Sequence, residues 1–413
     1  MPITEMPLDG SFLSGGYHVS VARTAAEMEA FRPDWELLNR NPNSQIDFFS
    51  LINSNRSSVL RPHVILIRQS EATRILVVGR VVEQEFGCAL GYKTISCGKV
   101  RQLDVLHGGL LGNCGGDFAE IVIKELVAAL NRGEADIVCL SHIKVDSDLF
   151  HAARRLPGFR CRDRVVQTQL HWKAQLPDSL EDFLRRLNKK HRYWARRMEK
   201  ALNKDFPEKV KFKHFDMYSD IEELANDVEI IARKTYQRGL GAGFVKNAEQ
   251  MQRLGFGRKK NWLRGMVLHI NDKPCAFWIG SVHKNVFYSE ATGYDSAYRK
   301  YELGTVVFLK LIEDLCREKV ESIDFGLGDA LYKSRFGDES WLEGSIRIYA
   351  PSFKGTKLNL LRTILEGSAL ATRRLVNRMG IEQHLKTLWR KKLASDHGSH
   401  EAALPSNNLD AGS

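Results

Sequence analysis

The chain has 413 residues, more than one ordinary hydrophobic core can organise, so we expect two domains with appendages. Hydrophobic residues make up 43% and charged residues 27% of the sequence, which excludes a wholly disordered or collagen-like chain. The formal net charge of +11 favours anionic partners such as nucleotide phosphates, tRNA, acidic glycans or anionic membrane surfaces.

The first half of the chain predicts an α/β lobe over residues 17–175, behind a flexible segment at residues 1–16. Short apolar or alternating runs indicate strands, and apolar residues at three- and four-residue spacing indicate helices. The expected strands are 17–22, 63–68, 74–85, 104–111, 136–142 and 165–173, and the expected helices are 26–40, 48–53 and 118–131.

A second lobe is predicted over residues 176–352, where the alternation restarts. Ser179 is suited to cap the long basic helical region that follows, and Pro207 ends that region. Because residues 185–204 concentrate positive charge, this helix is either a solvated face or a surface for an anion. Further helices are expected at 221–237, 248–259 and 302–319, and strands at 209–215, 262–270, 274–283, 286–293 and 322–326.

An internal repeat relates the two lobes. Residues 118–137 and 304–323 both read as helix, turn and strand, and they are in register at an offset of roughly 186 residues. In each copy a glycine-containing turn precedes the helix, and such a turn can cradle a phosphate. We therefore expect two divergent copies of one lobe, although two unrelated α/β lobes can also share this unit.

The C-terminal part of the chain differs from both lobes. Residues 353–393 space leucine, isoleucine and valine among arginine and lysine, which predicts one or two basic amphipathic helices. Such helices either pack on the second lobe or contact a membrane surface or a partner. Residues 394–413 are small and polar, so we expect them to be disordered.

The sequence predicts a cytoplasmic protein, at most peripheral to the inner membrane. The start of the chain lacks a basic and apolar signal segment, and no window approaches the ~20 apolar residues of a membrane span. Seven scattered cysteines indicate reduced thiols. His142, His151 and Cys161 lack metal-ligand spacing, so we expect no bound metal.

The most informative segment surrounds residues 299–305, where RKYELG meets the start of an apolar helix. The backbone amides of Leu303, Gly304 and Thr305, helped by the helix dipole and by Arg299, would bind a diphosphate. The carboxylate of Glu302 repels phosphate unless it points away.

This segment resembles the acyl-CoA pyrophosphate loop of GNAT acetyltransferases, with Arg299 and Gly304 matching its ends and Glu302 replacing its first glycine. A strand ending in DFGLG and a following Tyr-Lys pair are similar to the CelD/BcsL branch of that superfamily, which is associated with cellulose biosynthesis. The resemblance implies an α/β (α+β) fold of two tandem GNAT-like lobes, each a mixed, mainly antiparallel sheet flanked by helices, with amphipathic helices at the C-terminus.

The resemblance also implies direct acyl transfer, with acetyl the expected group, from acyl-CoA to an amine or hydroxyl of a cell-envelope or polysaccharide-related acceptor. Tyr332 stands where these enzymes place the acid that protonates the CoA sulfur, and Glu290 is the candidate base. Asp324 would orient Lys333 or cap its loop, and Lys333 would contact a CoA phosphate or an acidic acceptor. Tyr332 could instead be a packed aromatic residue, and Glu290 a cross-strand partner of a basic residue.

Two other functions fit the same residues. The twin lobes and the basic helix are similar to Fem-type aminoacyltransferases, which would make aminoacyl-tRNA the donor and residues 185–204 its binding surface. A non-catalytic protein of an envelope polysaccharide assembly would use a degenerate lobe and the basic C-terminal helices. The helix-terminal phosphate loop favours acyl-CoA as the donor.

Overall fold

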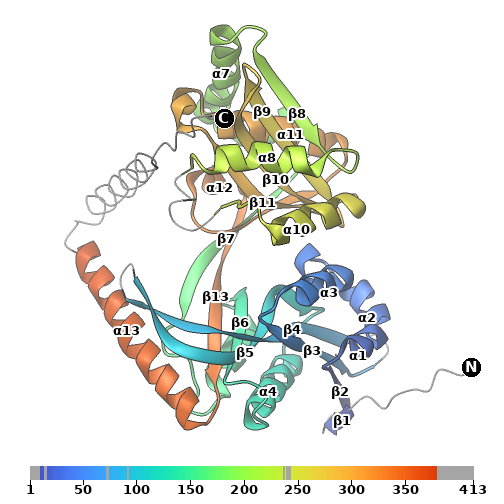
Figure 1. Ribbon diagram of the computed structural model, residues 1–413, viewed down its shortest axis with the longest axis vertical. Coiled ribbons are helices and arrows are strands. Elements are labelled where there is room, and N and C mark those ends of the chain that lie inside the picture. The colour runs from blue at the N-terminus through green and yellow to red at the C-terminus, as the bar shows by residue number, and fades with distance from the viewer. Residues whose placement is uncertain are drawn as a thin grey trace, which may run out of the picture. The chain divides into compact units, whose positions relative to one another are not determined.

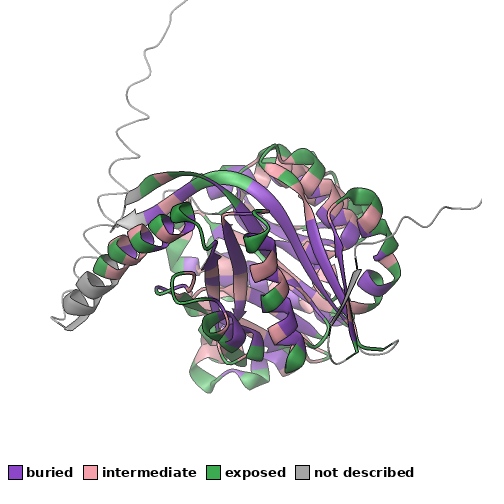
Figure 2. Ribbon diagram, turned by 90° about the horizontal axis from the view of Figure 1, so that it is seen from below, coloured by how far each residue is buried: buried purple, intermediate pink, exposed green. Residues whose placement is uncertain are grey.

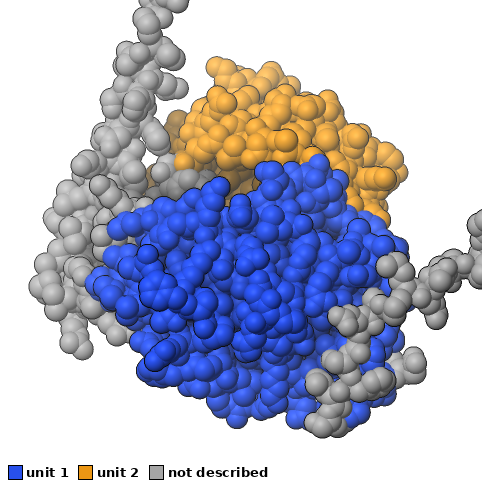
Figure 3. All heavy atoms as spheres, turned by 60° about the horizontal axis from the view of Figure 1, so that its bottom comes forward, with its two compact units in different colours: residues 1–187, 281–289, 315–369 blue, residues 188–280, 290–314, 370–413 orange. Residues whose placement is uncertain are grey.

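The computed structural model is a mixed α/β protein whose sheet strands are flanked by helices, which confirms the predicted fold class (Figure 1). It describes residues 10–13, 16–70, 74–90, 93–235, 238 and 243–378. The chain divides into two compact units, each built from separate parts of the sequence (Figure 3). Unit 1 comprises Met1–Leu187, Ser281–Ser289 and Leu315–Ala369, and unit 2 comprises Asn188–Gly280, Glu290–Asp314 and Leu370–Ser413.

Unit 1 is organised around a sheet in the strand order β1-β2-β3-β4-β5-β6-β13-β7-β12. Its strands are β1 (Gly10–Leu13), β2 (Tyr17–Ala22), β3 (Val59–Arg68), β4 (Arg74–Leu90), β5 (Lys93–Leu111), β6 (Ile137–Lys144), β7 (Gln167–Gln175), β12 (Ser322–Leu327) and β13 (Glu339–Tyr349). Neighbours in this order pair antiparallel except β5 and β6, which pair parallel.

The helices of unit 1 cover this sheet and its connections. They are α1 (Ala25–Ala30), α2 (Arg32–Leu38), η1 (Pro42–Ser44), α3 (Ile46–Asn55), α4 (Asp117–Asn131), α5 (Asp148–Arg155), α6 (Leu180–Arg186), α12 (Leu331–Phe336) and the first part of α13 (Phe353–Arg378). Strands are mainly buried, whereas helices expose their outer faces (Figure 2).

The core of unit 1 explains the position of α4. Its residues Val122, Ile123 and Leu126 are fully buried against sheet residues such as Val138 and Leu140. Each such side chain stabilises the fold by about 1.5–3 kcal/mol relative to exposure. The apolar residues recur at helical spacing because one face of α4 meets the sheet, as the sequence predicted for residues 118–131.

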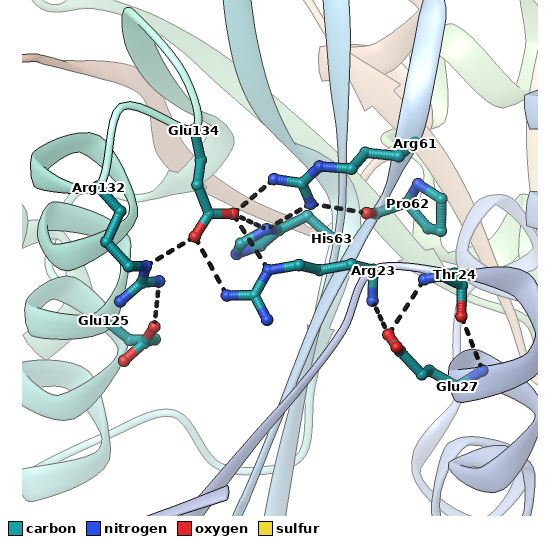
Figure 4. A network of polar contacts seen from close by, with 9 residues as sticks. All are labelled: Arg23, Thr24, Glu27, Arg61, Pro62, His63, Glu125, Arg132 and Glu134. Carbon is teal, nitrogen blue, oxygen red and sulfur yellow. Dashed lines mark hydrogen bonds and ion pairs between the residues drawn. The ribbon is translucent and has the colours of Figure 1, made fainter. Parts of the chain in front are cut away.

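A charge network ties the turn after α4 to β2 and β3 (Figure 4). The carboxylate of Glu134 accepts hydrogen bonds from Arg23 at 3.1 and 3.2 Å, from Arg132 at 2.7 Å, and from Arg61. Burial acts to raise the pKa of Glu134, but the arginines outweigh it and lower the value to about 2. Burial lowers the pKa of His63, whose Nδ1 lies 3.6 Å from Glu134, to about 3.

Strand β13 lies between β6 and β7, although it follows them in the chain by more than 160 residues. Its C-terminal half pairs with β6, from Glu343 opposite Lys144 to Tyr349 opposite Ile137. On its other edge it pairs with β7, with Trp341 opposite His171. No strand was expected from the sequence at residues 339–349, and no helix at the positions of α5 and α12.

Unit 2 contains the sheet order β11-β10-β9-β8. Its elements are α7 (Lys189–Asp205), β8 (Val210–Phe215), α8 (Ile221–Ala232), α10 (Ala248–Lys259), β9 (Leu263–Ile270), β10 (Lys273–His283), β11 (Val286–Tyr294), η2 (Ser296–Tyr301) and α11 (Leu303–Arg317). Residues 281–289 of β10 and β11 and residues 315–317 of α11 belong to unit 1, where β11 pairs parallel with β12. The predicted three-strand meander is therefore present.

The predicted basic helical region is interrupted. Leu187 adopts an extended conformation after α6, and Asn188 then caps α7 by accepting a hydrogen bond from the amide of His191 at 2.9 Å. The side chain of an N-cap residue accepts a hydrogen bond from a backbone amide that has no intrahelical partner. Asn188 therefore starts a second helix after α6. Ser179 caps α6 as predicted, with its hydroxyl 3.1 Å from the amide of Asp182.

Helix α13 begins in the region predicted as a basic amphipathic extension, and its described side chains pack on unit 1. Leu358, Asn359 and Arg362 are buried there. Asn359 donates to the carbonyl oxygens of Arg160 and Arg162. These contacts are with residues of the predicted first lobe, whereas Leu358 shares a hydrophobic cluster with Tyr349 of the predicted second lobe, on which packing was one of the two expected arrangements. Residues 379–393 and the predicted tail at 394–413 lie outside the described residues.

All seven cysteines are free thiols. Cys88 and Cys97 nevertheless face each other across β4 and β5, with their sulfurs 3.4 Å apart, a proximity that their separation in the sequence does not reveal. Across the part of the chain that the structure describes, no helix combines the length and the apolar character needed to cross a membrane.

Candidate active site

The predicted phosphate loop lies at the start of α11 in unit 2. Glu302 has a left-handed backbone, with φ at 45°, between η2 and the helix. Its carbonyl oxygen accepts a hydrogen bond from the amide of Thr305 at 2.8 Å. The amides of Leu303 and Gly304 are therefore the better candidates for holding a ligand's phosphate.

The left-handed residue explains how this sequence ends one helix and begins the next. A positive φ is costly for residues with a β-carbon and is ordinary for glycine. Glu302 occupies the position of the first glycine in the GNAT pattern, and it retains the backbone conformation that glycine favours. A β-carbon at Gly304 would meet only the Tyr294 ring, at 3.5 Å. Arg299, in η2, is exposed.

A second group of predicted residues lies in unit 1, at the end of β12. Asp324 accepts a hydrogen bond from the amide of Gly326 at 2.8 Å, so its carboxylate caps the turn that follows the strand. Gly326 and Gly328 have φ values of 67° and 107°, which explains the glycines of the DFGLG motif.

Lys333 binds the backbone of the same turn through its side chain. Its ammonium group is buried and donates to the carbonyl oxygens of Phe325 at 2.7 Å and Leu327 at 2.5 Å. Burial lowers the pKa of Lys333 to about 8. Tyr332 is half-buried on α12, with its ring edge against Phe325 at a centroid distance of 6.1 Å.

The predicted site residues thus fall into two groups. Unit 1 contains Asp324, Tyr332 and Lys333, and unit 2 contains Glu290, Arg299, Leu303, Gly304 and Thr305. Glu290 is exposed on β11.

The structure adds a polar cluster that the sequence analysis missed, beside Asp324. His171 Nε2 lies 2.7 Å from the carboxylate of Asp324, and its Nδ1 lies 3.2 Å from Glu343. His107 Nε2 lies 3.3 Å from the other oxygen of Glu343. Trp341 stacks on His171 at a centroid distance of 4.6 Å and donates to Glu343 at 2.7 Å.

The electrostatics of this cluster are strongly perturbed. Burial disfavours a charged imidazole, but the contacts with Asp324 and Glu343 outweigh it and raise the pKa of His171 to about 9. Burial likewise opposes ionisation of Glu343, yet the contacts with His107 and His171 hold the pKa of this carboxyl far below its usual range.

The alternation in residues 339–349 was the signal that could have revealed part of this cluster. Gly344, Ile346 and Ile348 are buried, whereas Ser345 and Arg347 are less so, which is the period of a strand. Glu343 would then have stood out as a carboxylate in a strand otherwise built for a sheet. Nothing local in the sequence predicts its pairing with His107 or His171.

Comparison with known proteins supports the fold. Residues 189–334 match the model of the Acetyltransferase (GNAT) domain. No curated protein matches the chain.

The solved structures that are similar to the chain include the following three. FemX has a TM-score of 0.50 at 8% identity, over 83% of this chain and 97% of its own. A tandem GNAT protein from the clavulanic acid biosynthesis pathway has a TM-score of 0.47 at 11% identity, over 81% and 99%. A probable N-acyltransferase from Enterococcus faecalis V583 has a TM-score of 0.37 at 12% identity, over 81% and 73%. At these identities the likeness to FemX concerns the fold alone.

Proposed function

We propose that this chain, an acyltransferase by the GNAT domain that its residues 189–334 match, transfers an acyl group, with acetyl the expected one, from acyl-CoA directly to an amine or hydroxyl. The observation that carries the proposal is the match to that domain over the segment that contains the left-handed Glu302 and the start of α11. Helix starts bind phosphate because their first amides and the helix dipole both attract anions.

In the proposed reaction, the amides of Leu303 and Gly304 and the guanidinium of Arg299 hold the donor's diphosphate. The acceptor's nitrogen or oxygen attacks the thioester carbonyl carbon, and the carbon–sulfur bond breaks. Glu290 takes the proton that the nucleophile loses, and Tyr332 gives a proton to the departing thiolate. Asp324 and Lys333 act as positioning residues, because their hydrogen bonds fix the turn that leads into Tyr332.

The acceptor in this proposal is an amino sugar, glycan hydroxyl or lipid-linked precursor of the cell envelope, as in the CelD/BcsL branch that the Asp324–Lys333 segment resembles. Cytoplasmic acyl-CoA is the matching donor, with the protein in the cytoplasm or peripheral to the inner membrane. The test is release of CoA thiol from acetyl-CoA in the presence of a panel of such acceptors. Thiol release that is independent of every acceptor would contradict the transfer.

A second donor is supported by the surface of α7. Lys189, Lys190, Arg196, Arg197 and Lys200 are exposed along this helix. Such a surface suits the phosphate backbone of RNA, and the Fem-like alternative would use it to hold aminoacyl-tRNA.

Thermal shift measurements separate the two donors. A ligand at 100 times its dissociation constant adds about 2.7 kcal/mol of stability. We expect acetyl-CoA and CoA to raise the melting temperature of the wild-type chain, and Arg299→Ala to reduce that shift. Arg196→Ala, a charge-matched control on α7, should leave it unchanged. If CoA compounds leave the melting temperature unchanged, and tRNA raises it in the wild type but not in Arg196→Ala, the Fem-like function replaces the proposal. If neither donor changes the melting temperature, the non-catalytic alternative replaces it.

A further inference from the structure

We propose that His107, His171 and Glu343 of unit 1 bind a divalent transition metal, with Zn²⁺ the best chemical match. We call these three residues the His–Glu cluster. Two imidazoles and one carboxylate are a ligand set that proteins use for catalytic zinc, where a fourth position stays open for water or substrate.

The ligand atoms of the His–Glu cluster lie close enough together to bind one ion. The ligand atoms of the three side chains all lie within 4.8 Å of one another. The contacts of Glu343 with His107 and His171 are 3.3 and 3.2 Å. Ligand atoms at zinc's tetrahedral bond lengths of ~2.0–2.1 Å stand about 3.3 Å apart, so these two contacts match the spacing, and the remaining separations of at most 4.8 Å shorten when an ion binds.

Two atoms of the His–Glu cluster lack the hydrogen bonds that buried polar atoms normally make. Among the residues that the structure describes, His171 Nδ1 and Glu343 Oε2 are buried atoms with no hydrogen-bond partner. Their side chains are only 4% and 7% exposed. Buried polar atoms without a hydrogen-bond partner destabilise the folded state. A metal ion held by these atoms removes that destabilisation.

The surroundings fix the orientation of both buried ligands. Asp324 holds His171 by Nε2, at 2.7 Å, which leaves Nδ1 for a metal. Trp341 donates to Glu343 Oε1 and stacks on the His171 ring, with Lys144 Nζ over the Trp341 ring at 4.5 Å. Carboxylates that hold the far nitrogen of a ligating histidine are a regular feature of metal sites.

The backbone near these side chains departs from regular strand pairing. The pairing register shifts beside each strand: between Val77 and Gly79 opposite β5, between Asp324 and Gly326 in β12, and between Gly344 and Ile346 in β13. Such bulges re-aim side chains and are enriched next to functional sites. His107 is the most accessible member, with 30% of its side chain exposed, and it gives an ion a way in.

A bound proton is the competing explanation of the His–Glu cluster. In that case His171 is an imidazolium between Asp324 and Glu343, and His107 is not needed to hold the proton. The two explanations differ in the importance of His107, because the Asp324–His171–Glu343 arrangement does not need it, whereas the metal loses a ligand without it.

Metal content decides between them. The full chain is stripped with chelator, incubated with Zn²⁺, desalted and analysed by plasma mass spectrometry, and Co²⁺ is titrated in parallel to follow its visible absorption. We expect one ion per chain in the wild type and in His151→Ala, a control at an exposed histidine on α5. We expect loss of that ion in His107→Gln and Glu343→Gln. Asp324→Asn should weaken Zn²⁺ affinity by about 10–100-fold, as outer-shell changes do.

Two results would overturn the proposal. One is a wild-type chain that retains no more Zn²⁺ than His107→Gln does; the other is a His107→Gln chain that retains as much as His151→Ala. Should Glu343→Gln fail to fold by circular dichroism, the partly exposed His107 still decides the matter, because its replacement leaves the buried pair intact.

Discussion

Tyr332 is the residue on which the acid step of the proposed transfer depends. Replacing it with phenylalanine keeps the ring against Phe325 and removes only the hydroxyl. We expect Tyr332→Phe to lower kcat for CoA release by about 10²- to 10⁴-fold, with little change in KM, because a general acid acts in the transition state. Tyr218→Phe, at a side chain 86% exposed, is the control. An unchanged kcat would make Tyr332 a packing residue.

Glu302 combines an unfavourable backbone with an unfavourable charge at the proposed phosphate loop. Removing the carboxylate should strengthen CoA binding, since a like charge near a phosphate costs about 1 kcal/mol at solvent-like screening, or roughly a fivefold change in Kd. We expect a lower Kd for Glu302→Gly and Glu302→Gln by isothermal titration. If only the glycine variant improves, the backbone and not the charge is responsible; weaker binding in both would mean that Glu302 itself holds the donor.

At the scale of elements, α13 is fixed to unit 1 by a buried ion pair. Arg362 and Asp163 are 2% and 1% exposed, and their charged atoms lie 2.6 Å apart. The same arginine donates to the carbonyl oxygen of Val165 at 2.7 Å and lies 2.9 Å from Glu366. This contact network, not the amphipathic pattern alone, determines where the described part of the helix lies.

Arg362→Met should therefore destabilise the protein. Removing one partner leaves buried carboxylates uncompensated, which costs about 3–5 kcal/mol. Lys357→Met, the same substitution at an exposed position of α13, should change the free energy of unfolding by less than about 0.5 kcal/mol. Urea denaturation of both variants provides the comparison. Equal stabilities would show that α13 contributes little to unit 1.

Strand β13 shows which structural features depend on local sequence and which depend on distant partners. The strands at 17–22, 262–270 and 274–283 were predicted because their period is local and their ends carry turn residues. Strand β13 has a similar period, but its place between β6 and β7 depends on partners far away in the chain. The residues opposite each other in a sheet follow from register, which no local pattern specifies.

For the whole molecule, the buried His63 predicts a loss of stability in mild acid. Its pKa is lowered by burial to about 3, from an ordinary value of 6.5, among Glu134, Arg23, Arg61 and Arg132. Below pH 6.5, His63 binds a proton in the unfolded chain but stays neutral in the folded chain. The free energy of unfolding therefore falls as pH drops from about 6.5 toward 3. Glu134, with its pKa lowered to about 2 from 4.5, adds to the loss only below pH 4.5.

The window between pH 6.5 and 4.5 therefore separates the effect of His63 from that of Glu134, and comparison with a His63 variant separates it from the other buried histidines, such as His283, whose pKa burial lowers to about 4. We expect the wild type to lose about 2 kcal/mol more than His63→Gln between pH 7 and 5, because each pKa unit corresponds to about 1.4 kcal/mol. Urea denaturation at pH 7, 6 and 5 measures the difference. His151→Gln, at an exposed histidine, should follow the wild type. Identical slopes for wild type and His63→Gln would mean that His63 is protonated in the folded protein.

The sequence by itself determined the α/β alternation, the meander of unit 2 and the helix start behind Arg299, because each depends on periodicity, capping residues or glycine within a few positions. It also indicated the Asp324–Lys333 turn, whose hydrogen bonds are local. Only the tertiary structure decided that His107, His171 and Glu343 meet, since three distant strands bring them together. Long-range pairing is a property of the whole core, in which every strand competes for its neighbours, so no short segment can encode it alone.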